Sequence, residues 1–177
     1  MNDTLKIIEA CDFAAFKHKF QRRKGYLRIP YINHPIKVSN LIANSGETNV
    51  NLLIAALLHD TLEDTDTNEQ ELADLFGINV LNIVKEVTDN MLLREKERKE
   101  LQVTKAPYLS QYAKIIKIAD KICNMNDILN YPLMWRRARK LHYFQWSMRV
   151  FNNCKGINNQ LDTLFIETHN RGIAKFG

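Results

Sequence analysis

Apolar residues recur at intervals of three and four along most of this chain, and this period commits it to packed helices. Alternating strand patterns flanked by hairpin turns are missing. One short piece, RIPYIN at residues 28–33, looks extended, because Pro30 and Pro35 force non-helical backbone around it. The periodic residues are Leu5, Ile8, Ala15 and Phe16; Ile36, Val38, Leu41 and Ile42; Leu52 to Leu58; Leu72, Leu75 and Phe76; Val80, Ile83, Val84 and Val87; Ile115, Ile116, Ile118, Ala119 and Ile122; and Phe144, Met148 and Phe151. We therefore expect an all-α fold, a bundle of about eight to ten helices.

Residues that favour helix N-termini mark several of the expected boundaries. One of residues 2–4 can cap the first helix, and Asn49 can cap the third. Thr67, followed three residues later by Gln70, matches the capping-box pattern. We therefore expect a helix to begin directly after Thr67.

The chain has the size of one domain. With 177 residues, 45% of them hydrophobic, and no low-complexity tract or long linker, residues 1–177 are expected to form a single domain. No run approaches the roughly 18 apolar residues of a membrane span, and the N-terminus MNDTLKIIEA is unlike a signal peptide. The cysteines, Cys11, Cys123 and Cys154, lack a CxxC pair and indicate neither a disulfide framework nor a zinc knuckle. We expect a cytoplasmic protein without a membrane partner.

The basic residues are bunched, and the formal net charge is +5. Such clusters attract polyanions, which include nucleic acids, acidic proteins and phosphate-rich small molecules. Charge alone does not choose among these three classes. The main clusters are Lys17, Lys19, Arg22, Arg23, Lys24 and Arg28, and then Arg136, Arg137, Arg139 and Lys140.

The stretch ALLHDTLEDT places an imidazole and several carboxylates in an otherwise apolar segment. A helix over residues 50–64 would put Glu63 beside His59, one turn on. By the same period, Asp64 would lie beside Asp60. Ionised carboxylates are costly to bury unless they are paired or bound to a metal, and they repel each other. A divalent cation removes both objections, so we expect a metal site here.

Further ligands must come from elsewhere, because the neighbours His59 and Asp60 cannot complete a coordination sphere. His34, in PYINHP, lies in a turn that prolines make rigid, and Asp120, in IIKIADKICNM, is an acid within an apolar helix. Either residue alone would more often be structural. Together the four make a two-histidine, two-carboxylate set that leaves positions open for water and substrate. The histidines without such company, which we expect on the surface or in the core, are His18, His142 and His169.

These motifs, in this order, resemble those of the HD superfamily of metal-dependent phosphohydrolases. The closest resemblance is to the hydrolase domain of RelA/SpoT enzymes, and it runs from CDFAAFKHKFQRRKG to YFQWSMRVFNNCKGINNQL. Chain length and tail are most similar to the stand-alone small alarmone hydrolases, the animal-type SpoT homologues. An HD dipeptide alone is a weak signal, but the HD-x2-ED block together with PYINHP and ADK-x2-N is a strong one.

The resemblance implies an all-helical enzyme of the HD-domain type that usually uses Mn²⁺. Its substrate would be guanosine tetra- or pentaphosphate, from which it would remove the 3′-pyrophosphate to give GDP or GTP. The metal ligands of the family fall on His34, His59, Asp60 and Asp120, and its catalytic acids fall on Glu63 and Asp64. Its nucleotide contacts fall on Arg23, Lys24, Tyr31, Asn124 and Arg139.

The residue types suit this chemistry. Two imidazoles with two carboxylates suit Mn²⁺, although zinc or iron could also occupy such a site. The hypothesis is that the metal acidifies a water and polarises a phosphoryl oxygen. One of Glu63 and Asp64 would deprotonate the water or protonate the departing ribose oxygen, and the sequence does not decide which acid plays which part. Arginines such as Arg23 suit phosphate, and their guanidinium can stack on a purine.

The segment TDNMLLREKERK departs from the family pattern. Relatives commonly carry an acid where Asn90 stands and lysines where Met91 and Glu95 stand, so the preferred substrate is open. An HD phosphatase of another nucleotide, such as one removing the 2′-phosphate of NADPH, is one alternative. A non-enzymatic binder of nucleotides or nucleic acid is the other.

The partner expected from this resemblance is a guanine nucleotide rather than a nucleic acid. The hydrolase resemblance uses up the chain, so alarmone synthesis is not expected. Neutralising a toxic synthetase by destroying its product would use the same chemistry. The sequence leaves a homo-oligomer open.

Overall fold

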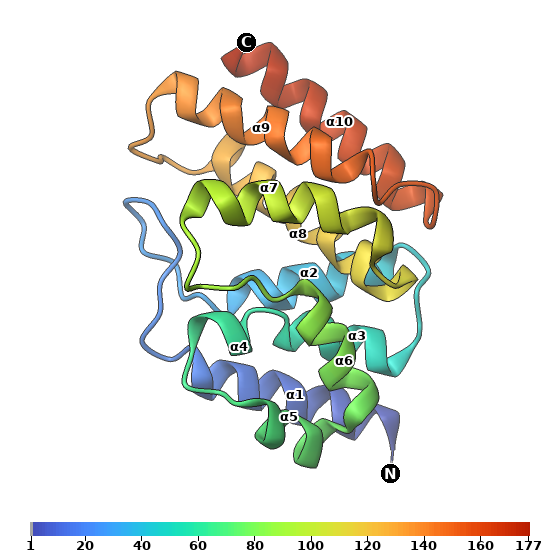
Figure 1. Cartoon of the computed structure of the whole chain (residues 1–177). Coiled ribbons are helices and arrows are strands. Elements are labelled where there is room, and N and C mark those ends of the chain that lie inside the picture. The colour runs from blue at the N-terminus through green and yellow to red at the C-terminus, as the bar shows by residue number, and fades with distance from the viewer. Residues whose placement is uncertain (1) are drawn as a thin grey trace.

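The computed structural model describes residues 2–177, and helices dominate it (Figure 1). The described residues contain no strand and only an isolated bridge between Arg22 and Pro30, so the expected all-α fold is confirmed. The ten α-helices within residues 2–177 are α1 (Asp3–Lys17), α2 (Asn33–Asn44), α3 (Val50–Leu58), α4 (Thr61–Asp64), α5 (Glu69–Phe76), α6 (Ile78–Val87), α7 (Glu95–Lys105), α8 (Gln111–Asn130), α9 (Arg137–Phe151) and α10 (Asn159–Phe176). A 3-10 turn, η1 (Ala106–Tyr108), joins α7 to α8. No helix in this part of the chain is long and apolar enough to cross a bilayer.

Side-chain caps fix the starts of several helices. Asn2 accepts a hydrogen bond from the Thr4 amide, and Asn49 caps α3 as expected. The helix expected to begin directly after Thr67 is α5, and its expected start is wrong by one residue. Asn68, not Thr67, caps α5 by accepting from the Glu71 amide at 3.0 Å. The hydroxyl of Thr67 is instead paired with that of Thr65 at 2.8 Å, so it is already engaged elsewhere.

Two apolar helices form the centre of the fold. α3 and α8 bury most of their residues, and α2 packs against both of them. α1 covers α3, whereas α10 covers α8. In Figure 1, α9 and α10 lie side by side above α7 and α8, and α1 and α5 lie at the opposite end of the molecule. The helices that carry the candidate ligands are therefore packed directly against one another.

A glycine allows the close approach of α9 and α10. A Cβ added to Gly172 would stand only 1.9 to 2.4 Å from three ring carbons of Phe144, which is fully buried. No side chain other than hydrogen fits at that distance. This contact fixes the spacing between α9 and α10.

The expectation of one continuous helix over residues 50–64 is wrong. α3 ends at Leu58 and α4 begins at Thr61, so His59 and Asp60 occupy a turn. The buried Thr61 donates its hydroxyl to the Leu58 carbonyl at 2.7 Å and so satisfies a helix-terminal acceptor. In a helix, neighbouring side chains point about 100° apart. In this turn the two converge, and His59 Nε2 lies 3.1 Å from Asp60 Oδ2.

Candidate active site

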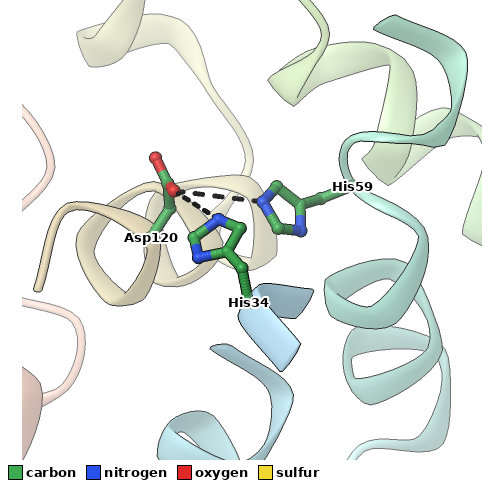
Figure 2. A group of neighbouring side chains, drawn as sticks. All are labelled: His34, His59 and Asp120. Atoms are coloured by element: carbon green, nitrogen blue, oxygen red, sulfur yellow. Dashed lines mark ion pairs between the residues drawn. The ribbon is translucent and has the colours of Figure 1, made fainter. Parts of the chain in front are cut away.

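Three predicted ligands from three helices meet in the interior. His34 lies in the first turn of α2, His59 directly follows α3, and Asp120 lies in the middle of α8. The expected non-helical turn at His34 and Pro35 is therefore wrong, because proline is tolerated in the first turn of a helix, where its missing N–H is not needed. One donor atom from each lies within 4.8 Å of the other two. Figure 2 shows both imidazoles directed at the Asp120 carboxylate, with Nε2 of His34 at 3.1 Å and Nε2 of His59 at 4.0 Å from Oδ1.

Asp60, the fourth predicted ligand, adjoins the same group. Its Oδ2 lies 3.1 Å from His59 Nε2 and 3.6 Å from His34 Nε2. The Tyr31 hydroxyl donates to that oxygen at 2.7 Å. Tyr31 was expected to contact the nucleotide, and the structure gives its hydroxyl a further role in orienting Asp60.

The donor set fits a divalent metal. His59 Nδ1 lies 2.8 Å from the Ala56 carbonyl oxygen and must donate to it, which leaves the lone pair on Nε2. That Nε2 is buried and faces two carboxylate oxygens, Asp60 Oδ2 at 3.1 Å and Asp120 Oδ1 at 4.0 Å. Asp120 is itself held by Asn124 and by Lys121, whose Nζ lies 3.0 Å from Oδ2. Buried imidazole nitrogens that converge with carboxylate oxygens form a donor set that a divalent metal would satisfy.

The two predicted catalytic acids differ in their surroundings. Glu63 accepts a hydrogen bond from the Asp89 amide at 2.9 Å. Burial outweighs that hydrogen bond and raises the pKa of Glu63 to about 7. Asp64 accepts instead from the side-chain amide of Gln21, whose Nε2 lies 2.9 Å from Oδ2. One acid can therefore hold a proton near neutral pH, and the other is held as an acceptor.

One cavity of about 400 Å³ contains these residues, a volume suited to a small-molecule ligand. It is lined by both acids and by all four predicted ligands. Of the predicted nucleotide contacts, Arg23, Lys24, Tyr31 and Asn124 also line it. The cavity therefore brings together every predicted site residue except Arg139.

Arg139 lies in an adjoining cavity of about 240 Å³. Its guanidinium stacks on Trp135, 4.4 Å from the ring centre, and Lys24 and Trp135 line both cavities. Arg139 therefore does not line the cavity that contains the other four predicted nucleotide contacts.

The carboxylate partner of Arg23 was not identified from the sequence. Asp127 Oδ2 accepts from Arg23 Nε at 3.0 Å and from Nη2 at 2.8 Å, and Asn124 accepts from the same guanidinium. The guanidinium is thus fixed before any ligand arrives. The signal was available, because Asn124 and Asp127 follow Asp120 at helical spacing on one face of α8.

Two buried lysines on α8 were also missed. Lys121 pairs with Asp120 and stands 4.5 Å from the Trp146 ring centre, and Asp120 raises its pKa against the effect of burial. Lys117 donates to the Val87 carbonyl at 2.7 Å, and burial lowers its pKa. Both line the main cavity, so they bring positive charge to a wall that otherwise carries carboxylates.

Two positions that depart from the family pattern lie at these cavities. Met91 lines the main cavity. Glu95 lines the adjoining one, where Lys99 pairs with it at 2.8 Å. Sequence variation in the α6–α7 connection and the first turn of α7 therefore changes the chemistry of the cavity walls.

The chain is similar to known proteins along most of its length. The family model described as HD domain matches residues 10–151. A guanosine-3′,5′-bis(diphosphate) 3′-pyrophosphohydrolase MESH1 of Xenopus tropicalis is 45% identical over 98% of both chains. The MESH1 of Homo sapiens is 45% identical over 91% of both chains.

Solved structures share the architecture. The structure of a metazoan ortholog of SpoT that hydrolyses ppGpp covers 94% of each chain, with 40% sequence identity and a TM-score of 0.91. The structure of lmo0812 from Listeria monocytogenes EGD-e, with 24% identity and a TM-score of 0.67, shares the fold.

Proposed function

The chain belongs to the HD domain family, and we propose that it is a metal-dependent guanosine-3′,5′-bis(diphosphate) 3′-pyrophosphohydrolase. It removes the 3′-pyrophosphate of guanosine alarmones and gives GDP or GTP. The observation that carries this proposal is one cavity lined by all four candidate ligands and both acids, in a chain 45% identical to a hydrolase of that name over 98% of both chains. In this proposal residues 1–177 act as a single domain.

The proposed metal site consists of His34, His59 and Asp120, with Asp60 as the fourth ligand. Mn²⁺ is the proposed ion, because mixed imidazole and carboxylate donors suit it. When bound, it would acidify water and act as a Lewis acid toward a phosphoryl oxygen. Tyr31 keeps Asp60 oriented, and Lys121 with Asn124 keeps Asp120 oriented.

The two acids take different parts in this proposal. Glu63 has a pKa of about 7, so it can deliver a proton to the departing ribose 3′-oxygen near neutral pH. Asp64, which accepts a hydrogen bond from Gln21, accepts the proton of the attacking water. The separate environments of Glu63 and Asp64 support this division, because Glu63 is held by a backbone amide and Asp64 by the side chain of Gln21.

The phosphates and base of the substrate are proposed to contact the basic side of the two cavities. Arg23, fixed by Asp127, presents a guanidinium beside Tyr31, whose ring centre lies 5.3 Å away. Lys24 borders both cavities, and Arg139 extends the positive wall into the second one. Several negative charges on one nucleotide can thus be met along one surface.

A second candidate activity is supported by Met91. The family resemblance places a lysine at this position, and a methionine in the cavity wall lacks the positive charge that a pyrophosphate would meet. A nucleotide with a single phosphate at the reacting end, such as NADPH with its 2′-phosphate, loses less electrostatic attraction by that change.

The cytoplasm remains the proposed compartment, and the three free cysteines are in keeping with it.

A substrate panel tests the proposal. Purified protein with Mn²⁺ is incubated with guanosine tetraphosphate, guanosine pentaphosphate or NADPH, and the products are separated by anion exchange. The proposal expects pyrophosphate together with GDP or GTP. Orthophosphate from NADPH alone would instead support the second activity. A folded, metal-binding protein that releases neither product would be a binder and not a hydrolase.

A further inference from the structure

A buried histidine at the end of α1 is joined to the candidate active site by one glutamine. His18 is only 2% exposed, and its Nδ1 lies 2.5 Å from Gln21 Oε1. The other end of the same amide donates from Nε2 to Asp64 Oδ2. The three side chains form a line from the core to the cavity wall. His18 was expected as an isolated surface or core histidine, and the structure shows it buried but connected to the site.

The chemistry of the groups gives each bond one direction. An ionised Asp64 only accepts, so the NH₂ group of Gln21 must face it. The carbonyl oxygen of Gln21 then faces His18, and the imidazole must donate from Nδ1. The other ring nitrogen, Nε2, is buried and has no partner in the described part of the chain. An imidazole that donates from Nδ1 therefore favours the same orientation of the Gln21 amide as Asp64 does, with the NH₂ group toward Asp64.

The backbone of Gln21 is also held on both sides. Its amide donates to the His18 carbonyl at 2.9 Å, and its carbonyl accepts from the Tyr31 amide at 3.1 Å. A loop residue with both its backbone and its side chain held loses little entropy when it orients a neighbour. Asp64 Oδ2 is thus fixed, while Oδ1 has no hydrogen-bond partner among residues 2–177.

We propose that Gln21 is a positioning residue for Asp64 and that His18 fixes the direction of the Gln21 amide. This inference rests on the proposed function, in which Asp64 accepts a proton from water. Holding one carboxylate oxygen keeps the other aimed at the reacting atoms. Small displacements of a catalytic group cost up to about 10²-fold in rate.

Four single variants test the chain of hydrogen bonds from His18 through Gln21 to Asp64, which we call the relay. Gln21→Leu is expected to lower kcat about 10- to 100-fold with KM nearly unchanged, because only the orientation of Asp64 is lost. His18→Leu removes the donor and is expected to lower kcat about 10-fold. His18→Asn places an amide nitrogen near the position of Nδ1 and should recover most of that loss. Gln111→Leu, at an exposed position on α8, is the control and should change nothing. Thermal melts show whether each variant folds.

A double-mutant cycle separates positioning from a purely structural role. In an Asp64→Asn background, followed by single-turnover kinetics, Gln21→Leu should change the rate less than about 2-fold, because its target is gone. Equal losses in both backgrounds would overturn the inference. So would a His18→Asn enzyme as slow as His18→Leu.

An NMR measurement tests the relay independently of activity. Long-range ¹H–¹⁵N spectra of the full chain should show His18 protonated at Nδ1, and the side-chain amide signals of Gln21 should shift in Asp64→Asn. A His18 ring protonated only at Nε2 would refute the relay. If the wild type releases no pyrophosphate, the proposed function fails, while these spectra still decide the relay.

Discussion

Replacing Glu63 by glutamine should stabilise the metal-free protein at alkaline pH while abolishing turnover. Burial raises the pKa of Glu63 from an ordinary 4.5 to about 7 in the folded state. The folded chain therefore keeps its proton between these values, whereas the unfolded chain loses it. The stability that this proton contributes is full below pH 4.5 and is lost as the pH rises through about 7.

The magnitude follows from that difference in pKa. It corresponds to at most about 3 kcal/mol at pH 8, and the partial solvent contact of the carboxylate reduces this to about 1–3 kcal/mol. Glutamine carries no charge and can still accept the hydrogen bond from the Asp89 amide. Glu63→Gln should thus be more stable than the wild type by about 1–3 kcal/mol at pH 8 and within about 0.5 kcal/mol of it at pH 4.5.

The assay is urea unfolding followed by far-UV circular dichroism, in EDTA, at both pH values. The matched control is Glu167→Gln on α10, which makes the same substitution at an exposed position. Comparing variant with wild type cancels the titrating groups that do not interact with Glu63. A Glu63→Gln protein that gains the same stability at both pH values, or loses stability at pH 8, would show that burial does not raise the pKa of Glu63.

Three further outcomes follow from contacts elsewhere. Gly172→Ala should destabilise the fold by about 1–3 kcal/mol in urea unfolding, because its methyl group would overlap the Phe144 ring; an unchanged midpoint would contradict that packing. Asp127→Ala leaves the Arg23 guanidinium without its carboxylate and should cost about 2–4 kcal/mol and raise KM, whereas unchanged stability and KM would show that the pair is not needed. Met91→Lys adds a cation to the cavity wall and should lower KM for guanosine tetraphosphate several-fold relative to NADPH, and a selectivity that does not move would remove Met91 from substrate choice.

The helices were predictable because burial imposes the period. Every strongly periodic apolar segment became a helix. The structure brings the four candidate ligands together, and three of them, His59, Asp60 and Asp120, were marked by lying in apolar segments. The turn at His59 and Asp60 was not predictable from period, because it depends on the Thr61 hydroxyl bonding to one carbonyl. The helical period of the sequence continues through residues 59 and 60, where α3 has ended and α4 has not begun.

The contacts that sequence could not give depend on how separate segments meet. The link from His18 through Gln21 to Asp64 joins α1, a loop and α4, and nothing in the local pattern marks it. Arg139 was grouped with the other nucleotide contacts, but the packing of α9 puts it in the second cavity. The residues that bind Arg23, Asn124 and Asp127, lie on one face of α8 and were predictable from their helical spacing.

In the proposed function, His34, His59, Asp60 and Asp120 hold a metal that is needed to release pyrophosphate. The direct measurement is pyrophosphate release from guanosine tetraphosphate by Mn²⁺-loaded protein, with an EDTA-treated sample and the variants Asp60→Ala and Asp66→Ala. Asp66 is the control, because its side chain is 88% exposed. We expect EDTA and Asp60→Ala to abolish the release and Asp66→Ala to leave it intact. Release that persists in EDTA or in Asp60→Ala would contradict it.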